Sequence, residues 1–217
     1  MRIAILGTGM VGRGLAGRLV DLGHQITVGT RDPEAATTGS GEYATWLAAQ
    51  PQVDTRTFAE AAAAGEVVVN ATNGHVSLEV LRTAGAENLA DKPLIDLANP
   101  IEFGPEGLTL FVEDTDSLAE QIQREFPEAR VVKALNTLNV SMMVNPGQIN
   151  ESGTLFVSGD DAAAKATVTG LLHELGHTDV IDLGDITTAR GTEMWLPLWF
   201  RLMQALGTPA FNLKIIR

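Results

Sequence analysis

The chain has 217 residues, with 27 acidic and 15 basic side chains and a formal net charge of −12. Its length fits one domain of ordinary size, and its 45% share of hydrophobic residues suffices for a buried core. The excess of negative charge, with no run of lysine and arginine, argues against nucleic acid and anionic membranes as main partners. The absence of cysteine excludes disulfides, thiolate metal sites and a cysteine nucleophile.

The first residues resemble a secretory signal only superficially. One arginine precedes apolar residues, but the continuous apolar run covers only residues 3–6 before glycines interrupt it. A secretory core needs about 7–15 apolar residues, and a membrane span needs roughly 20. We therefore expect a first β-strand here, a cytoplasmic protein and no membrane partner.

Short apolar runs alternate with helix-forming segments along the chain. Strands are predicted at residues 2–6, 25–30, 53–56, 66–71, 93–97, 130–135, 154–158 and 178–183. Helices are predicted at residues 11–22, 43–49, 57–65, 76–84, 117–126 and 162–175, and again after residue 187. This alternation predicts an α/β fold with a doubly wound, mostly parallel sheet in residues 1–185. Residues 186–217 are expected to form a C-terminal helical segment that packs on it.

A glycine-rich loop follows the first predicted strand and opens the first predicted helix. It reads Gly7-Thr8-Gly9-Met10-Val11-Gly12 and matches the pattern G-x-G-x-x-G. Gly7 permits a tight turn, Gly9 lets the backbone approach a pyrophosphate, and Gly12 lets the helix pack on the strand. The backbone of Thr8, Met10 and Val11 then presents N–H groups to the phosphates at a helix N-terminus. The loop predicts a Rossmann dinucleotide-binding domain.

The end of the second predicted strand indicates which dinucleotide is bound. A site for NAD places an acidic residue there, but this chain has Thr30 and Arg31. The arginine offers a planar set of donors and the threonine a hydroxyl, both suited to the 2′-phosphate of NADP. Asp32, one residue later, is expected to cap a helix that starts at Pro33. We therefore predict NADP, with Arg13 as a further candidate contact to the phosphates.

Uncharged polar residues follow three later strands, where ligands bind in open α/β sheets. They are Thr72, Asn73, Asn99, Pro100, Asn136 and Thr137. These residues are expected to surround the nicotinamide. His75 is the one titratable neighbour, and the Tyr-x-x-x-Lys pair of many ketone reductases is missing because the sole tyrosine, Tyr43, is followed four positions later by Leu47.

No proton-transferring catalytic residue is therefore predicted. Hydride exchange between two redox carriers requires mainly positioning, because the chemistry belongs to the cofactors. A redox coenzyme is thus a suitable second substrate.

A literal H-E-x-x-H motif, the zinc-protease pattern, occurs at residues 173–177. Zinc binding would require both histidines on one face of a helix. Gly176 instead predicts that the helix ends before His177, so the motif is interpreted as a helix terminus and no metal site is predicted.

The most apolar segment of the chain lies near its C-terminus. It contains Trp195 and Trp199, and Pro197 is expected to kink a helix or to begin a new one. Core packing is one interpretation, and a lid over the nicotinamide or a dimer interface is the other.

The sequence resembles the NADPH-dependent reductases of the deazaflavin coenzyme F420. The resemblance rests on residues 1–31, 131–137, 157–161 and 211–215. It implies a Rossmann domain, NADP, hydride transfer to the deazaflavin and a homodimer. In that family a Ser/Thr-Arg pair holds the 2′-phosphate, which Thr30 and Arg31 match, and an Ala-Leu-x-Thr segment, here residues 134–137, lines the nicotinamide.

Two departures leave alternatives to the deazaflavin open. The archaeal members have an extra glycine in the first loop, and they have histidine where this chain has Asn136. The Asn-Thr version is similar to the cytosolic domain of some membrane ferric reductases. The alternatives are an NADPH-dependent reductase of flavin, ferric chelate or imine, and a non-catalytic NADP-binding sensor.

Overall fold

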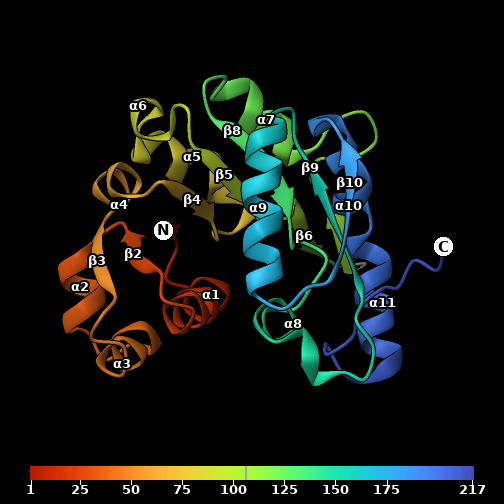
Figure 1. The fold of residues 1–217 in the computed structure, drawn as a ribbon, viewed down its shortest axis with the longest axis horizontal. Helices are drawn as coiled ribbons and strands as arrows, with labels where there is room; N and C mark the ends of the chain where they lie inside the picture. Colours follow the sequence, from red (N-terminus) through yellow and green to blue (C-terminus); the bar gives the residue numbers. More distant parts are fainter. Residues whose placement is uncertain (106) are drawn as a thin grey trace.

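The computed structural model describes residues 1–105 and 107–217 and confirms the predicted fold class (Figure 1). Eight strands form one sheet in the order β10-β9-β8-β5-β4-β1-β2-β3. The strands are β1 Arg2–Leu6, β2 Gln25–Thr30, β3 Asp54–Thr57, β4 Val67–Asn70, β5 Pro93–Asp96, β8 Arg130–Ala134, β9 Thr154–Ser158 and β10 Asp179–Gly184. All eight predicted strands are present, and each end lies within one residue of its predicted position.

The sheet is parallel except at one boundary. Strand β1 lies between β4 and β2, and both pairings are parallel. Strand β9 pairs antiparallel with β8, with Lys133 opposite Ser158, and then pairs parallel with β10. The last two strands therefore run against the other six. The alternation of strands and helices in the sequence did not predict this reversal.

Helices cover both faces of the sheet, and Figure 1 shows α9 in front of it. The helices are α1 Met10–Asp21, α2 Pro33–Thr38, α3 Glu42–Ala48, α4 Phe58–Ala64, α5 Gly74–Ala84, α6 Ala86–Leu89, α7 Leu118–Glu125, α8 Val140–Val144, α9 Ala162–Glu174, α10 Ala189–Met194 and α11 Leu196–Leu206. Short 3-10 helices occupy Pro146–Gln148 and Ile186–Thr188. The sequence predicted neither the short helices α6 and α8 nor the antiparallel hairpin of β6 Ile101–Gly104 and β7 Gly107–Leu110.

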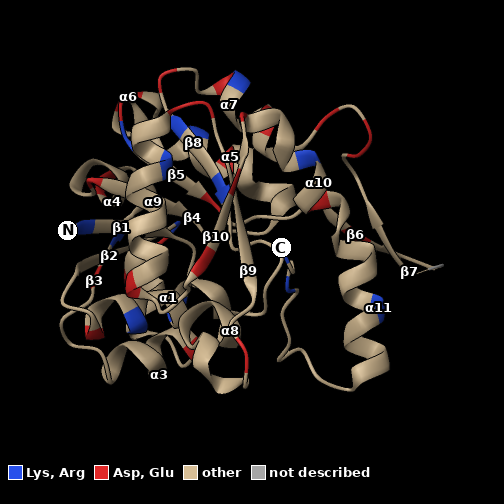
Figure 2. Ribbon diagram, turned by 45° about the vertical axis from the view of Figure 1, so that its right-hand side comes forward, with Lys and Arg blue, Asp and Glu red and all other residues tan. Residues whose placement is uncertain are grey.

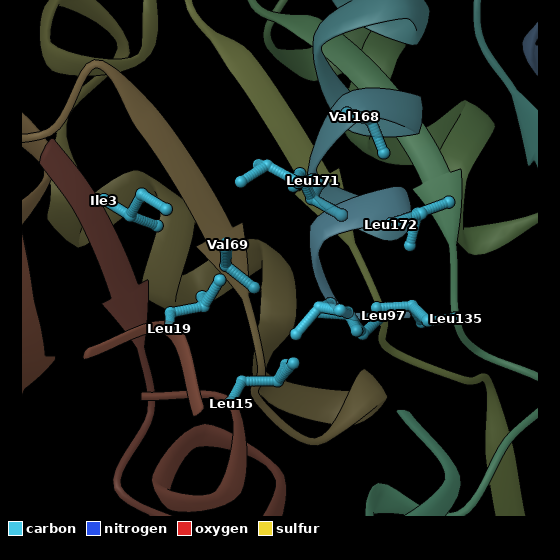
Figure 3. Close-up of a pocket in the computed structure, with 11 residues that line it drawn as sticks. Ile3, Leu15, Leu19, Val69, Leu97, Leu135, Val168, Leu171 and Leu172 are labelled. Carbon is cyan, nitrogen blue, oxygen red and sulfur yellow. The ribbon is translucent and has the colours of Figure 1, made fainter. Parts of the chain in front are cut away.

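Alternating side chains of the strands build a separate core on each face. In β1, Ile3 and Ile5 belong to one core with residues of α1 and α9, whereas Ala4 and Leu6 belong to the other with residues of α4, α5 and α7. This two-sided burial explains why the strands read as short continuous apolar runs. Figure 3 shows the first core, where aliphatic side chains surround a cavity of only about 20 Å³. That space is a packing void too small for a substrate.

The C-terminal elements extend from the sheet and return to it. Pro197 lies in the first turn of α11 and begins a new helix there, which was one of the two predicted outcomes. Helix α11 lies beside the β6–β7 hairpin (Figure 2), and among its residues only Leu196 is buried. The tail then reaches β9, where the amide of Thr154 donates to the carbonyl of Leu213 at 2.8 Å. The division of the chain at residue 185 stays a prediction.

Candidate dinucleotide-binding site

Each of the three motif glycines of the loop between β1 and α1 has a distinct structural reason. Gly7 has φ +118°, and a Cβ there would lie 2.8 Å from the carbonyl oxygen of Ala71. A Cβ on Gly12 would lie 2.1 Å from the carbonyl oxygen of Gly7, so glycine lets α1 start against the strand. A Cβ on Gly9 would meet no protein atom within 4 Å. The open side of the loop at Gly9 therefore fits a pyrophosphate that approaches the backbone.

The N-terminus of α1 faces this opening. Gly9 is the N-cap and supplies no side chain, so no side-chain cap satisfies the first N–H groups, which include those of Met10 and Val11. Helix N-termini with unsatisfied N–H groups bind phosphates. Arg13 donates to the carbonyl of Thr8 at 3.2 Å and to Glu42 at 2.5 Å. In this structure Arg13 therefore stabilises the loop through Nη1, and its Nη2 is already paired with a carboxylate.

Arg31 stands at the end of β2, next to the glycine loop. The two segments are joined directly, because the amide of Gly7 donates to the carbonyl of Gly29 at 3.0 Å. Arg31 is exposed and has no hydrogen bond or ion pair with any residue that the structure describes. Among the described residues Asp32 forms no ion pair with Arg31, and its carboxylate accepts the amide of Ala35 at 3.0 Å and caps α2 as predicted. Arg31 and the half-buried Thr30 are thus available for a 2′-phosphate.

The residues after β4 are held by local hydrogen bonds. The hydroxyl of Thr72 donates to the side chain of Asn70 at 2.6 Å. The side-chain oxygen of Asn73 accepts the amide of His75 at 3.0 Å and caps α5. His75 stacks on Phe111 with ring centroids 4.2 Å apart. Thr72 therefore faces the sheet network, and the oxygen of Asn73 is used as a helix cap.

Two of the predicted residues from separate strands meet directly. The amide nitrogen of Asn136 donates to the side-chain oxygen of Asn99 at 2.9 Å, and the amide nitrogen of Asn99 donates to the carbonyl of Asn136, also at 2.9 Å. Asn136 further donates to the carbonyl of Thr192 on α10 at 3.0 Å. We call Asn99 and Asn136 the amide pair. It joins the end of β5, the end of β8 and α10, and the adjacent Pro100 is buried.

The backbone beside the amide pair is strained. Leu135 has φ +61°, a left-handed conformation that is unfavourable for a branched side chain. Its side chain is 5% exposed and lines the aliphatic cavity of Figure 3. Such strain persists only where the surroundings enforce it, and it concentrates at functional sites. Burial of Leu135 thus fixes the direction in which Asn136 and Thr137 leave the sheet.

A buried charged network that sequence reasoning missed lies beneath these residues. Lys133 is 1% exposed, and its ammonium contacts Asp96 and Glu193, each at 2.7 Å, and the carbonyl of Ala98. Asp96 also accepts the side-chain amide of Asn70 at 2.8 Å. Because Thr72 binds Asn70, the network runs from the end of β4 through β5 and β8 to α10.

The charge state of the network follows from its composition. Burial alone would lower the pKa of the Lys133 ammonium, but attraction by Asp96 and Glu193 outweighs it and holds that pKa above the ordinary lysine value. Burial raises the pKa of Glu193, against the attraction of Lys133. Lys133 therefore stays protonated in the core.

A shallow apolar pocket adjoins the amide pair. It has a cavity volume of about 190 Å³ and is lined by Thr137, Phe156, Leu183, Gly191, Thr192, Trp195 and Leu213. Two of the lining residues adjoin the amide pair, since Thr137 follows Asn136 and Thr192 accepts its hydrogen bond. The C-terminal segment thus forms part of the wall beside the predicted nicotinamide position.

The H-E-x-x-H segment forms a helix terminus, as predicted. Helix α9 ends at Glu174, and Gly176 follows with φ +103°. His173 donates to the carbonyl of His177 at 2.8 Å, and His177 is buried and donates to the carbonyl of Met143 at 2.9 Å. Both ring contacts are thus made to backbone carbonyls. Among the described residues, no group of three or more potential ligands is arranged to hold a metal ion.

Comparison with known proteins agrees with this geometry. Residues 2–100 match the family model "NADP oxidoreductase coenzyme F420-dependent". A crystal structure from Arthrobacter sp. FB24, described as a candidate F420-dependent NADP reductase, is 58% identical over all of both chains, with a TM-score of 0.97. The chain belongs to this family. It is an NADP-dependent oxidoreductase.

More distant relatives have different described activities. The chain is 28% identical to an F420-dependent NADP reductase of Methanothermobacter thermautotrophicus, over 93% of this chain and 89% of that protein. It is 30% identical to the metalloreductase STEAP3 of Rattus norvegicus over 91% of its own length. The match spans only 38% of the rat protein. In the part of the chain that the structure describes, every helix is too short or too polar to cross a membrane.

Proposed function

We propose that this oxidoreductase transfers a hydride between NADPH and the deazaflavin coenzyme F420. The observation that carries the proposal is the uncharged rim of the site, formed by the amide pair and Thr137. These groups do not exchange protons near neutral pH, so they suit an acceptor that is itself a redox carrier. The similarity to the Arthrobacter protein over the whole chain supports the deazaflavin as that carrier.

Each end of the dinucleotide has a proposed set of contacts. The glycine loop and the first turn of α1, from Gly7 to Gly12, would hold the pyrophosphate, and Thr30 with Arg31 would hold the 2′-phosphate. The nicotinamide side comprises Thr72, Asn73, Asn99, Pro100, Asn136 and Thr137. When bound, NADPH would supply the hydride. The side-chain oxygen of Asn136, the hydroxyl of Thr137 and the side-chain nitrogen of Asn73 have no partner among the described residues, so these groups would orient the nicotinamide ring. The other side chains would limit the access of water.

The pocket beside Thr137 is the proposed place for the acceptor ring. It is apolar, it adjoins the amide pair, and Trp195 and Phe156 offer it aromatic surface. A planar ring binds well in such surroundings, because aromatic side chains stack and exclude water. This position would bring the acceptor to the nicotinamide side of the site rather than to the phosphate side.

A homodimer completes the proposal. Helix α11 and the neighbouring hairpin expose several large apolar side chains, including Phe103 at 66%, Leu198 at 49% and Leu206 at 56%. Apolar surface of this kind on one face is typical of protein contacts. We propose that a second copy of the chain covers the exposed side of α11.

A reductase of a ferric chelate or flavin is the second candidate. The observation that favours it is the 30% identity to the rat metalloreductase. In this alternative the NADP contacts stay the same and only the acceptor changes.

The test is NADPH oxidation by the purified full-length protein with oxidised F420 as sole acceptor. Rapid turnover with NADPH, and little with NADH, would support both the acceptor and the role of Arg31. Turnover of flavin or ferric chelate but not of F420 would favour the second candidate. Tight NADPH binding without turnover of any of these acceptors would contradict both candidates and favour an NADP-binding sensor.

A further inference from the structure

The buried carboxylate of Glu193 connects three parts of the fold. Glu193 is 1% exposed and lies on α10. Its carboxylate contacts the ammonium of Lys133 at 2.7 Å and accepts the first two amides of α7, from Leu118 at 2.8 Å and from Ala119 at 3.1 Å. It thereby fixes α10 against β8 and against the N-terminus of α7.

Lys133 has no donor left for a ligand. An ammonium has three N–H donors, and three acceptors lie around it: Asp96, Glu193 and the carbonyl of Ala98. Its partners belong to β5, to α10 and to the residue before Asn99. Lys133 consequently acts on other parts of the protein and not on substrate or cofactor.

The two charged residues hold the amide pair from both sides. Ala98, whose carbonyl binds Lys133, precedes Asn99 in the chain. Thr192, whose carbonyl accepts the amide of Asn136, precedes Glu193. Lys133 itself lies three residues before Asn136 on β8. Lys133 and Glu193 thus contact, or lie within three residues of, each segment that bears or binds the amide pair.

We propose that Glu193, through Lys133, is a positioning residue that holds the amide pair in the geometry required by the nicotinamide. The inference rests on the proposed placement of NADP. Stability alone does not account for the network, because a buried ion pair is often replaced by apolar residues at little cost or with a gain. The buried charges of Asp96, Lys133 and Glu193 lie under the strained backbone at Leu135. They are better explained by a requirement that the amide pair keep one fixed geometry.

The experiment compares two isosteric variants of the full-length protein, Glu193→Gln and Glu120→Gln. Glu120 is the matched control. It is also buried and also joins α7 to α10, through two hydrogen bonds to Arg190, but it contacts neither Lys133 nor the amide pair. Four quantities are measured for each variant: the melting temperature, the emission spectrum of bound NADPH, the Kd of NADPH, and the Kd of 2′,5′-ADP. The last ligand is a fragment that carries the 2′-phosphate but no nicotinamide.

Glu193→Gln is expected to raise the Kd of NADPH about tenfold, which is in the range of typical coupling between sites. The Kd of 2′,5′-ADP should change less than about twofold. The emission spectrum of bound NADPH should shift towards that of the free nucleotide, since its ring is no longer held. Glu120→Gln should lower the melting temperature and leave both Kd values and the emission unchanged.

Three outcomes would overturn the inference. These are unchanged NADPH binding by Glu193→Gln, equal weakening of NADPH and 2′,5′-ADP, and the same selective loss in Glu120→Gln. If Glu193→Gln does not fold, the triple variant Asp96→Asn, Lys133→Met, Glu193→Gln removes all three buried charges together and keeps a side-chain oxygen for the amides of α7. NADPH binding equal to wild type in that variant would refute the proposal. A wild-type protein that binds no NADPH would refute the proposed function, and this inference with it.

Discussion

Replacement of Arg31 by alanine tests how the protein distinguishes NADPH from NADH. Arg31 is exposed and has no partner among the residues that the structure describes, so its loss should leave the melting temperature unchanged. A hydrogen bond to a charged group contributes about 1.5–3 kcal/mol. Because about 1.4 kcal/mol corresponds to a factor of ten, the Kd of NADPH should rise about 10- to 150-fold. Solvent screening of an exposed side chain favours the lower end of this range.

The measurement is a titration of both nucleotides by quenching of tryptophan fluorescence, at low and at high salt. The Kd of NADH should change less than about twofold, because it has no 2′-phosphate for the arginine to bind. Arg82→Ala is the control, since Arg82 is an exposed arginine of α5 that is already paired with Glu125. Equal losses for NADPH and NADH, or no loss for either, would refute the assignment of Arg31.

Further predictions concern the loop, a buried histidine and α11. Gly12→Ala would place a Cβ 2.1 Å from a backbone oxygen and should lower the free energy of unfolding in urea by roughly 1–3 kcal/mol. Gly9→Ala should change the free energy of unfolding by less than about 1 kcal/mol but still weaken the binding of NADPH. A larger loss of stability for Gly9→Ala than for Gly12→Ala would contradict the loop assignment. Burial lowers the pKa of His177, so the stability it confers is present above the unfolded pKa of about 6.5 and is lost as pH falls towards the lower folded value. His177→Gln should flatten this part of a pH series of urea unfolding, and an unchanged slope would refute the role of His177. Leu198→Glu should convert a dimer to a monomer in sedimentation velocity, whereas a monomeric wild type at micromolar concentration would refute the dimer.

Local patterns in the sequence predicted most of the fold. The eight strands follow from short apolar runs, and the starts of several helices follow from caps that the structure contains, such as Thr57 with Glu60 at α4 and Ser117 at α7. The reversal of β9 was not predictable in this way, because strand direction depends on long-range pairing. The β6–β7 hairpin was also missed, because each strand has only four residues, too few for the alternation of apolar and polar residues to stand out.

The sequence predicted candidate site residues only where they lie in a recognised motif or at the end of a predicted strand. The glycine loop, Arg31 and the amide residues belong to this class. The network of Asp96, Lys133 and Glu193 does not, because its members are far apart in sequence and meet only in the folded core. One signal was present: Lys133 lies within an apolar strand, and a lysine buried there requires a buried acidic partner. The sequence did not show which acidic residue this is.

The proposed phosphate contacts and the proposed acceptor pocket come from opposite ends of the chain. The proposed phosphate contacts come from the first 31 residues, whereas the residues that line the proposed acceptor pocket all follow residue 136, up to Leu213 near the C-terminus. The family model correspondingly matches only residues 2–100. Under the proposed function, substitutions in the last third of the chain would therefore alter the acceptor and leave the recognition of NADP unchanged. Such a division would let related reductases share an electron donor and differ in what they reduce.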